Sequence, residues 1–238
     1  MARVAKGSTA LRRHAWLAAG GVFIVWVLAM AAAFWVLFFV WHHLAAGFVV
    51  AVLSLALVVV ASALMDRSLI PIRGYLGERR VCRELAQLPD EYWILNDVQI
   101  NAGGKTAQID HVLVSPHGIW CIETKSNFGW IFGQRWDRTW TQVKKSERGR
   151  THKRQMGNPV AQDEWHRSLL DEYLKQRLDF WCPAKCLVVL TAGRLMKDVQ
   201  NVIGVRDVRP EAQRADTKTW LNEDQIQRVL EALLENKR

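Results

Sequence analysis

The chain has 238 residues, of which 32 are Lys or Arg and 23 are Asp or Glu, so it is basic. Its four cysteines are too few for the disulfide framework that holds small secreted domains together, which excludes that class. Only Cys182 and Cys186 lie close in sequence, and no second Cys/His pair with zinc-finger spacing accompanies them, so no zinc site is expected.

The first 65 residues differ sharply from the rest because they contain no Asp or Glu. Residues 15–41 carry no charge, and after His42 and His43 a second uncharged stretch covers 44–65. Each stretch is longer than the about 20 apolar residues that cross a bilayer as a helix. A cleaved signal peptide would have a shorter apolar region. The sequence therefore predicts a hairpin of two transmembrane helices over 15–65.

Basic residues flank this hairpin and predict its orientation, because Lys and Arg concentrate on the cytoplasmic side of membrane segments. They lie in the N-terminal segment 1–14 (Arg3, Lys6, Arg12, Arg13) and after the second stretch (Arg67, Arg73, Arg79, Arg80). Neither stretch has an ionisable residue at mid-depth, which favours an anchor over a transporter. The expected location is the inner (cytoplasmic) membrane, with both termini and the soluble domain in the cytoplasm and the lipid bilayer as a partner.

Residues 66–74 are predicted to be a linker, and residues 75–238 a single α/β domain. Its predicted elements are, in chain order, a helix at 75–88, strands at 92–100, 106–115, 119–125 and 129–134, a loop at 141–158, a helix at 161–178, strands at 187–190 and 202–208, and a helix at 223–234. Short glycine turns join the first three strands as an antiparallel meander. Asn222 and Gln225 predict a reciprocal cap at the start of the last helix.

Three charged residues of this meander suggest chemistry. Strand alternation places Glu123 and Lys125 on one face of their strand, and Asp110 on the face of Val112 in the neighbouring strand. Two carboxylates can bind Mg²⁺ or Mn²⁺, and a lysine beside them can stabilise the negative charge that develops in phosphodiester hydrolysis. The alternative is the solvated face of a half-buried sheet. The apolar run at 119–122, which leads directly into Glu123, favours a site.

The chain resembles the nuclease-related domain (NERD) family of the PD-(D/E)xK, restriction-endonuclease-like superfamily. The resemblance covers roughly residues 74–180 and consists of ordered short motifs: Gly77-Glu78, Gln108-Ile109-Asp110-His111-Val112, Gly118-Ile119, Ile122-Glu123-Thr124-Lys125, Trp140 with Gln142, and Asn158-Pro159 with Gln162. It implies a restriction-endonuclease-like mixed sheet flanked by helices, here preceded by the transmembrane hairpin.

The resemblance also implies roles for single residues. Asp110 and Glu123 match the metal-binding acids of the family, and Lys125 matches its catalytic lysine. Glu78 matches an acid on the first helix that approaches the metal from the side. Gln162 resembles an additional catalytic glutamine of some superfamily members, although a polar residue at a helix start is an equal alternative. His111, on the other side of its strand, is expected to be structural.

A basic segment follows at residues 144–154. Its six cationic side chains, expected to bind nucleic acid, are Lys144, Lys145, Arg148, Arg150, Lys153 and Arg154. Such a segment beside a phosphodiesterase site attracts nucleic-acid phosphates, although anionic lipid head groups are an alternative partner. The nearby Trp130, Trp136 and Trp140 can stack on bases or belong to the core.

Together these features predict a membrane-anchored, divalent-metal-dependent nuclease that hydrolyses phosphodiester bonds, with DNA favoured over RNA. The alternative is a binding module of the same fold that tethers nucleic acid or a protein to the membrane without cleaving it, because this fold also hosts non-cleaving relatives. Endonuclease or exonuclease action and the oligomeric state are left open.

Overall fold

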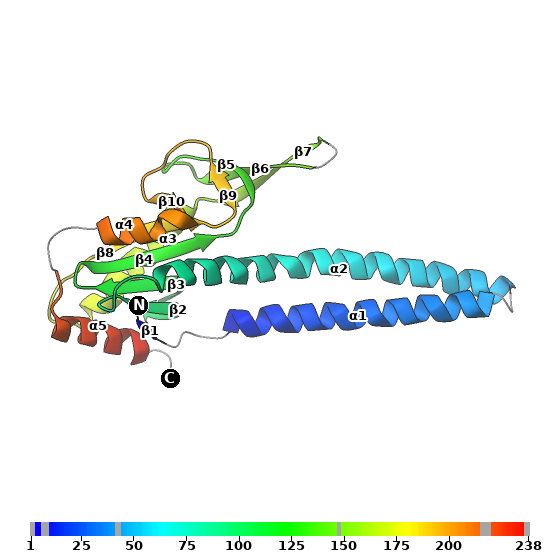
Figure 1. Cartoon of the computed structure of the whole chain (residues 1–238), viewed down its shortest axis with the longest axis horizontal. Helices are drawn as coiled ribbons and strands as arrows, with labels where there is room; N and C mark the ends of the chain where they lie inside the picture. Colours follow the sequence, from blue (N-terminus) through cyan, green and yellow to red (C-terminus); the bar gives the residue numbers. More distant parts are fainter. Residues whose placement is uncertain (1–2, 6–9, 41–43, 147–148, 215–219, 236–238) are drawn as a thin grey trace. The chain divides into compact units, whose positions relative to one another are not determined.

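The computed structural model of the chain describes residues 3–5, 10–40, 44–146, 149–214 and 220–235 (Figure 1). Two compact units make up the chain. One is Thr9–Tyr75, and the other combines Met1–Ser8 with Leu76–Arg238.

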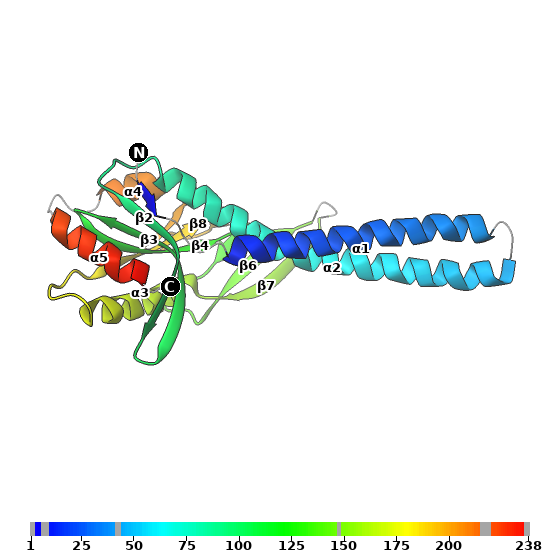
Figure 2. The ribbon, with the colours of Figure 1, turned by 90° about the horizontal axis from the view of Figure 1, so that it is seen from below.

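The smaller unit contains helix α1 (Ala10–Val40) and the first part of helix α2 (Leu44–Leu85), which run antiparallel to one another (Figures 1 and 2). A membrane span requires about 20 apolar residues within one helix. In the part of the chain that the structure describes, no helix combines the length and apolar character needed for such a span. The predicted transmembrane hairpin at 15–65 and the inner-membrane location are therefore wrong, and nothing in the described residues supports the lipid bilayer as a partner.

Helix α2 also replaces the expected linker. Residues 66–74 lie inside this helix, which continues past Pro71 to Leu85, so the helix predicted at 75–88 is the end of a longer one.

The larger unit contains two sheets and several helices. The first sheet consists of β1 (Arg3–Ala5), β2 (Trp93–Ala102), β3 (Lys105–Ser115), β4 (Gly118–Lys125), β8 (Ala184–Leu190) and β10 (Val202–Gly204), in that order. The second has the order β7 (Thr151–Gly157), β6 (Thr139–Lys145), β5 (Gly129–Phe132) and β9 (Gly193–Leu195). The further helices are α3 (Pro159–Lys175), a 3₁₀ turn at Val205–Asp207, α4 (Val208–Arg214) and α5 (Glu223–Glu235).

The predicted meander is confirmed. Strands β2, β3 and β4 pair antiparallel, and β4 pairs parallel with β8, so the first sheet is mixed. The cap of the last helix is confirmed as well. The backbone N–H of Asn222 donates to Oε1 of Gln225, and the backbone N–H of Gln225 donates to Oδ1 of Asn222, each at 2.9 Å.

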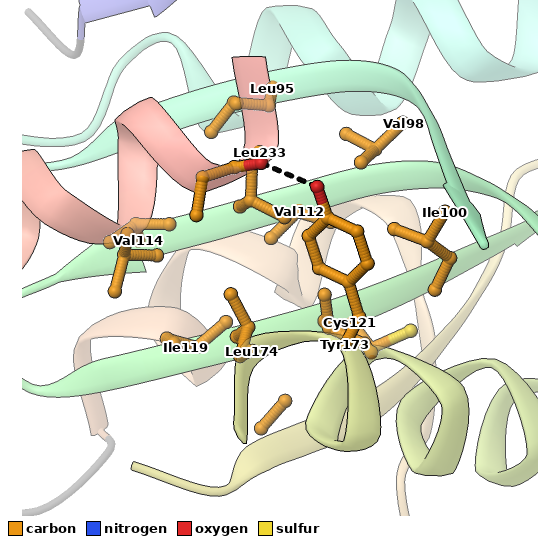
Figure 3. Packing of buried hydrophobic residues seen from close by; sticks show 14 of the residues in the cluster. Leu95, Val98, Ile100, Val112, Val114, Ile119, Cys121, Tyr173, Leu174 and Leu233 are labelled. Carbon is orange, nitrogen blue, oxygen red and sulfur yellow. Dashed lines mark hydrogen bonds between the residues drawn. The ribbon is translucent and has the colours of Figure 1, made fainter. Parts of the chain in front are cut away.

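Helices cover both faces of the first sheet. One face packs against α3 and α5, where the Tyr173 hydroxyl donates to the carbonyl oxygen of Ala232 at 2.6 Å and ties the two helices together (Figure 3). The opposite face packs against α4 and the end of α2, with Leu85 and Val208 against Ile122 of β4. Strand β4 is therefore buried over most of its length, and only its last residues approach solvent.

The side-chain alternation of β2 and β3 is interrupted at one position on each strand, where the two residues do not pair in the ladder. Residues three apart face the same core cluster on each strand: Leu95 with Val98, and Ile109 with Val112. Asp97 has a φ of 52°, a left-handed value that Asp tolerates better than most residues, and Asp97 and Asp110 are the pair missing from the ladder. Asp110 therefore does not share the face of Val112, and that prediction is wrong because strict alternation does not hold there.

The segment predicted as a loop at 141–158 is a hairpin of β6 and β7. Strand β7 is exposed along most of its length, so it has no apolar pattern that could identify it in the sequence. The strand expected at 202–208 ends at Gly204, and the chain then continues into the 3₁₀ turn and α4.

Candidate functional site

Asp110 lies beside the end of β4. The regular ladder between β3 and β4 ends at the pair of His111 and Ile122. Beyond it, Oδ2 of Asp110 accepts a hydrogen bond from the backbone N–H of Thr124 at 2.8 Å. The carboxylate is thereby fixed next to the segment that carries Glu123 and Lys125, so the structure brings these predicted residues together.

Glu123 is almost completely buried, with 3% of its surface exposed. The ammonium group of Lys125 lies 2.5 Å from Oε1, and Nδ1 of His166 lies 3.2 Å from Oε2. Burial alone would raise the pKa of Glu123, but the contacts with His166 and Lys125 outweigh it and hold this pKa below its ordinary value. Glu123 is therefore a buried anion that lies between the ammonium group of Lys125 and the imidazole of His166.

Lys125 has a second partner on α3. Its Nζ donates to Oε1 of Gln162 at 2.9 Å, so the ammonium group is held between a carboxylate and an amide. Asn158 caps this helix, accepting from the backbone N–H of Val160 at 2.9 Å, which fixes the first turn that presents Gln162. The structure thus brings Gln162 to the predicted site.

Glu78 belongs to the same electrostatic neighbourhood. Burial, followed by the negative charges of Asp110, Asp97 and Glu123, raises the pKa of Glu78 to about 8. Burial and the charge of Glu123 likewise raise the pKa of Asp110 to about 7. These carboxylates repel one another, and a cation bound among them would relieve that repulsion.

The close packing around Gly77 explains why a glycine precedes Glu78. A Cβ atom at this position would lie 2.9 Å from Oγ1 of Thr191 and 3.1 Å from Cβ of Ser126. Only a residue without a side chain allows α2 to approach the ends of β4 and β8 this closely. The Gly77-Glu78 motif therefore combines a packing requirement with an acidic side chain.

Two residues of α3 near the site were not predicted from the sequence. His166 contacts Glu123, and Asp163 is fully buried. Burial raises the pKa of Asp163 to about 7. Both lie within four residues of Gln162 on a helix predicted to be amphipathic, so polar residues on its buried side were the available signal.

His111 has the structural role that was expected. Its Nδ1 lies 2.6 Å from Oδ1 of Asn96 on the neighbouring strand, and burial lowers the pKa of the imidazole to about 4. The ring is therefore neutral at physiological pH and serves to pair β2 with β3.

The acidic residues fit a small divalent cation in a limited way. Within the described residues, no group of three or more His, Cys, Asp or Glu side chains is arranged to hold a metal ion, so the set of Glu78 with Asp110 and Glu123 does not form a three-acid cluster. Magnesium does not need one, because it is usually held by one or two carboxylates together with waters and substrate phosphates. Oε2 of Glu123 is buried and makes no hydrogen bond, although Nδ1 of His166 lies 3.2 Å away, so it keeps an acceptor for such an ion.

The predicted basic residues lie on the β6–β7 hairpin, which projects from the rest of the larger unit (Figure 1). Lys145, Arg150, Lys153 and Arg154 are exposed or partly exposed on it, and Nζ of Lys144 lies 4.0 Å from the ring centroid of Phe128. Arg148 lies outside the described residues. Among the tryptophans, Trp140 belongs to the core, whereas Trp130 and Trp136 are exposed.

This geometry defines a class of domain. It is a mixed sheet between helices, in which two acids and a lysine lie together at the end of a buried strand. The family described as nuclease-related domain (NERD) matches residues 73–191, half of the chain, and the chain belongs to this family. It is 33% identical over 111 residues to an uncharacterized protein of Bacillus anthracis, a match that covers 44% of this chain and 49% of that protein. The chain thus spans about half the length of that curated relative. No solved structure matches. Membership identifies residues 73–191 as a nuclease-related domain.

Proposed function

We propose that this protein is a divalent-metal-dependent nuclease that hydrolyses phosphodiester bonds, with DNA as the favoured substrate. The observation that carries the proposal is the position of Lys125, whose ammonium group is held by Glu123 and Gln162 next to the carboxylate of Asp110. A lysine paired only for stability would not need two buried or half-buried acids beside it, since burying like charges together is costly.

In this proposal Asp110 and Glu123 hold the ion, which is Mg²⁺ or Mn²⁺. When bound, it would polarise a phosphoryl oxygen and make an attacking water more acidic. Lys125 orients that water and stabilises the negative charge that develops on the phosphate. Gln162 and Glu123 together keep the ammonium group in place, and His166 positions the carboxylate of Glu123. Glu78, whose pKa burial and the neighbouring acids raise to about 8, would lie close to the ion as a further acidic group.

The test is a cleavage assay of the full chain on linear duplex DNA, circular DNA, single-stranded DNA and RNA, with Mg²⁺ or Mn²⁺. Asp110→Asn and Lys125→Ala are expected to reduce cleavage by about 10²–10³-fold or more. Their matched controls are Asp179→Asn and Lys175→Ala, which change exposed residues outside the site and should cleave like the parent. Thermal unfolding of each variant checks that the fold is retained.

Two outcomes would contradict the proposal. Equal cleavage by the parent and both site variants would remove these residues from the reaction. A parent that binds nucleic acid but does not cleave it with either metal would identify a non-cleaving binding module instead.

A further inference from the structure

The second sheet has one covered face and one open face. On the covered face, Ile131 and Trp140 are fully buried and pack with Val160 of α3 and Leu190 of β8. Gln142 lies on the same side and is also buried, and it pairs in register with Ile131. Because neighbouring residues in a strand point to opposite faces, the side chains between these positions lie on the other face, where Val143 is nearly buried and its cross-strand neighbours are exposed.

The open face carries exposed aromatic side chains. Trp130 and Phe132 of β5 are 43% and 44% exposed. Trp130 lies in register with Val143 of β6, and Val143 lies in register with Lys153 of β7. The next row is Phe132 with Thr141 and Gln155, and Nε2 of Gln155 donates to Oγ1 of Thr141 at 3.2 Å, so the two strands share this face.

Cationic side chains lie on either side of these aromatic residues. Arg194 of β9 pairs with Trp130 on one side, and Lys153 lies across β6 on the other. Lys145 lies further along the same face of β6, next to Thr151. The four strands contain no Asp or Glu. The open face therefore combines two exposed aromatic rings with positive charge.

The geometry points to this open face as a binding surface for single-stranded nucleic acid, with Trp130 and Phe132 stacked on unpaired bases and Lys145, Lys153 and Arg194 near the phosphates. Aromatic side chains on a basic surface are the usual means of binding single strands, because every base offers a ring face. In a duplex these ring faces are covered by neighbouring base pairs. The inference rests on the proposed nuclease function and specifies its substrate as single strands or unpaired ends.

The chain connects this surface directly to the candidate site. Strand β4 ends at Lys125, and Trp130 follows five residues later on β5. Five extended residues span at most about 18 Å. The Cα atom of Trp130 therefore lies within about 18 Å of that of Lys125, which limits how far a bound nucleic acid must reach to the candidate site.

The test measures binding by fluorescence anisotropy on the full chain in EDTA, so that no metal-dependent cleavage occurs. The probes are a labelled single-stranded oligonucleotide, its duplex, and an abasic oligonucleotide of the same length, which keeps the phosphates and lacks the bases. The double variant Trp130→Ala/Phe132→Ala is compared with Trp181→Ala, which removes a 58% exposed tryptophan outside the second sheet. The conservative variant Trp130→Phe retains a stacking ring.

The parent is expected to bind the single strand more tightly than the duplex. The double variant should weaken this binding about tenfold to hundredfold while leaving abasic binding unchanged. Trp181→Ala and Trp130→Phe should bind like the parent. Lys153→Gln should lower the slope of log affinity against log salt concentration by about one on all three probes, because about one phosphate contact is lost.

Several results would overturn the inference. These are equal affinity of the parent for single strand and duplex, or a loss of affinity in the double variant that is as large on the abasic oligonucleotide as on the single strand. Cleavage by the parent without any dependence of binding on Trp130 would reject this surface and leave the nuclease intact. Conversely, base-dependent binding through Trp130 without cleavage would keep the surface and reject the nuclease.

Discussion

The first sheet is covered by helices on both faces, whereas the second sheet is covered on one face only. The acids and the lysine lie in the first sheet, at the end of a strand whose first six residues are buried. The second sheet presents basic and aromatic side chains to solvent on strands that begin only a few residues further along the chain.

This difference separates two requirements of the proposed nuclease. Chemistry depends on charged groups held in fixed positions away from bulk water, which raises or lowers their pKa values and strengthens their interactions. Capture of a long, flexible polyanion depends on accessible cations and ring faces. A sheet that is buried on both faces can satisfy the first requirement, and a sheet with an open face can satisfy the second. A domain that has to meet both requirements therefore needs both kinds of sheet.

The largest expected effect concerns the single covered face of the second sheet. Trp140 is fully buried there, and its Nε1 donates to the carbonyl oxygen of Gln134 at 2.9 Å. Trp140→Ala should lower the free energy of unfolding by about 3–5 kcal/mol, because it leaves a large cavity. Denaturant unfolding of the full chain measures this. The control Trp136→Ala removes an 81% exposed ring and should change it by less than about 0.5 kcal/mol. A loss below about 1 kcal/mol for Trp140→Ala would mean that the two sheets do not unfold together.

A smaller effect is expected within the buried site. His166 contacts Glu123 and positions it for the proposed reaction. His166→Gln should reduce metal affinity and cleavage about tenfold to hundredfold, the usual cost of losing a partner that orients a ligand. Calorimetry with Mn²⁺ measures the affinity independently of turnover. Ser168→Ala, an exposed change on the same helix, is the control, and equal affinity in the two variants would rule out this role for His166.

The smallest effect is a change in how stability depends on pH. The pKa of Glu78 is raised from 4.5 to about 8, so the folded state binds a proton that the unfolded state has already lost in this range. The stabilisation is complete below about pH 4.5 and is lost as the pH rises through about 8. In EDTA the Tm of the parent should therefore fall as the pH rises from about 4.5 to about 8. The fall should be less steep for Glu78→Gln, and it should keep the slope of the parent for the exposed Glu91→Gln. Identical slopes for the parent and Glu78→Gln would contradict the assignment.

Much of the fold could be predicted from the sequence, in those regions where local patterns agree with the tertiary structure. The glycine turns predicted the meander, and Asn222 with Gln225 predicted a helix start that the structure confirms. The order of Asp110, Glu123, Lys125 and Gln162 predicted side chains that the structure does bring together.

The rest depended on features that local patterns do not contain. Strict alternation gave the wrong face for Asp110, because the left-handed φ of Asp97 interrupts two paired strands at once. The hairpin of β6 and β7 was expected as a loop because β7 is solvated and has no apolar face of its own. His166 was missed because its role comes from a contact with a distant strand.

The parallel pairing of β4 with β8 continues beyond the first sheet. The partners Lys125 and Leu190 end one ladder, and the partners Gly129 and Gly193 begin the next. The two chain segments therefore both cross from the first sheet to the second, through residues 126–128 in one case and 191–192 in the other. A residue inserted between β4 and β5 would shift β5 by one position and turn Trp130 towards the core and Ile131 towards solvent. The tips of hairpins tolerate changes in length, whereas a change of one residue before β5 would exchange the two faces of that strand.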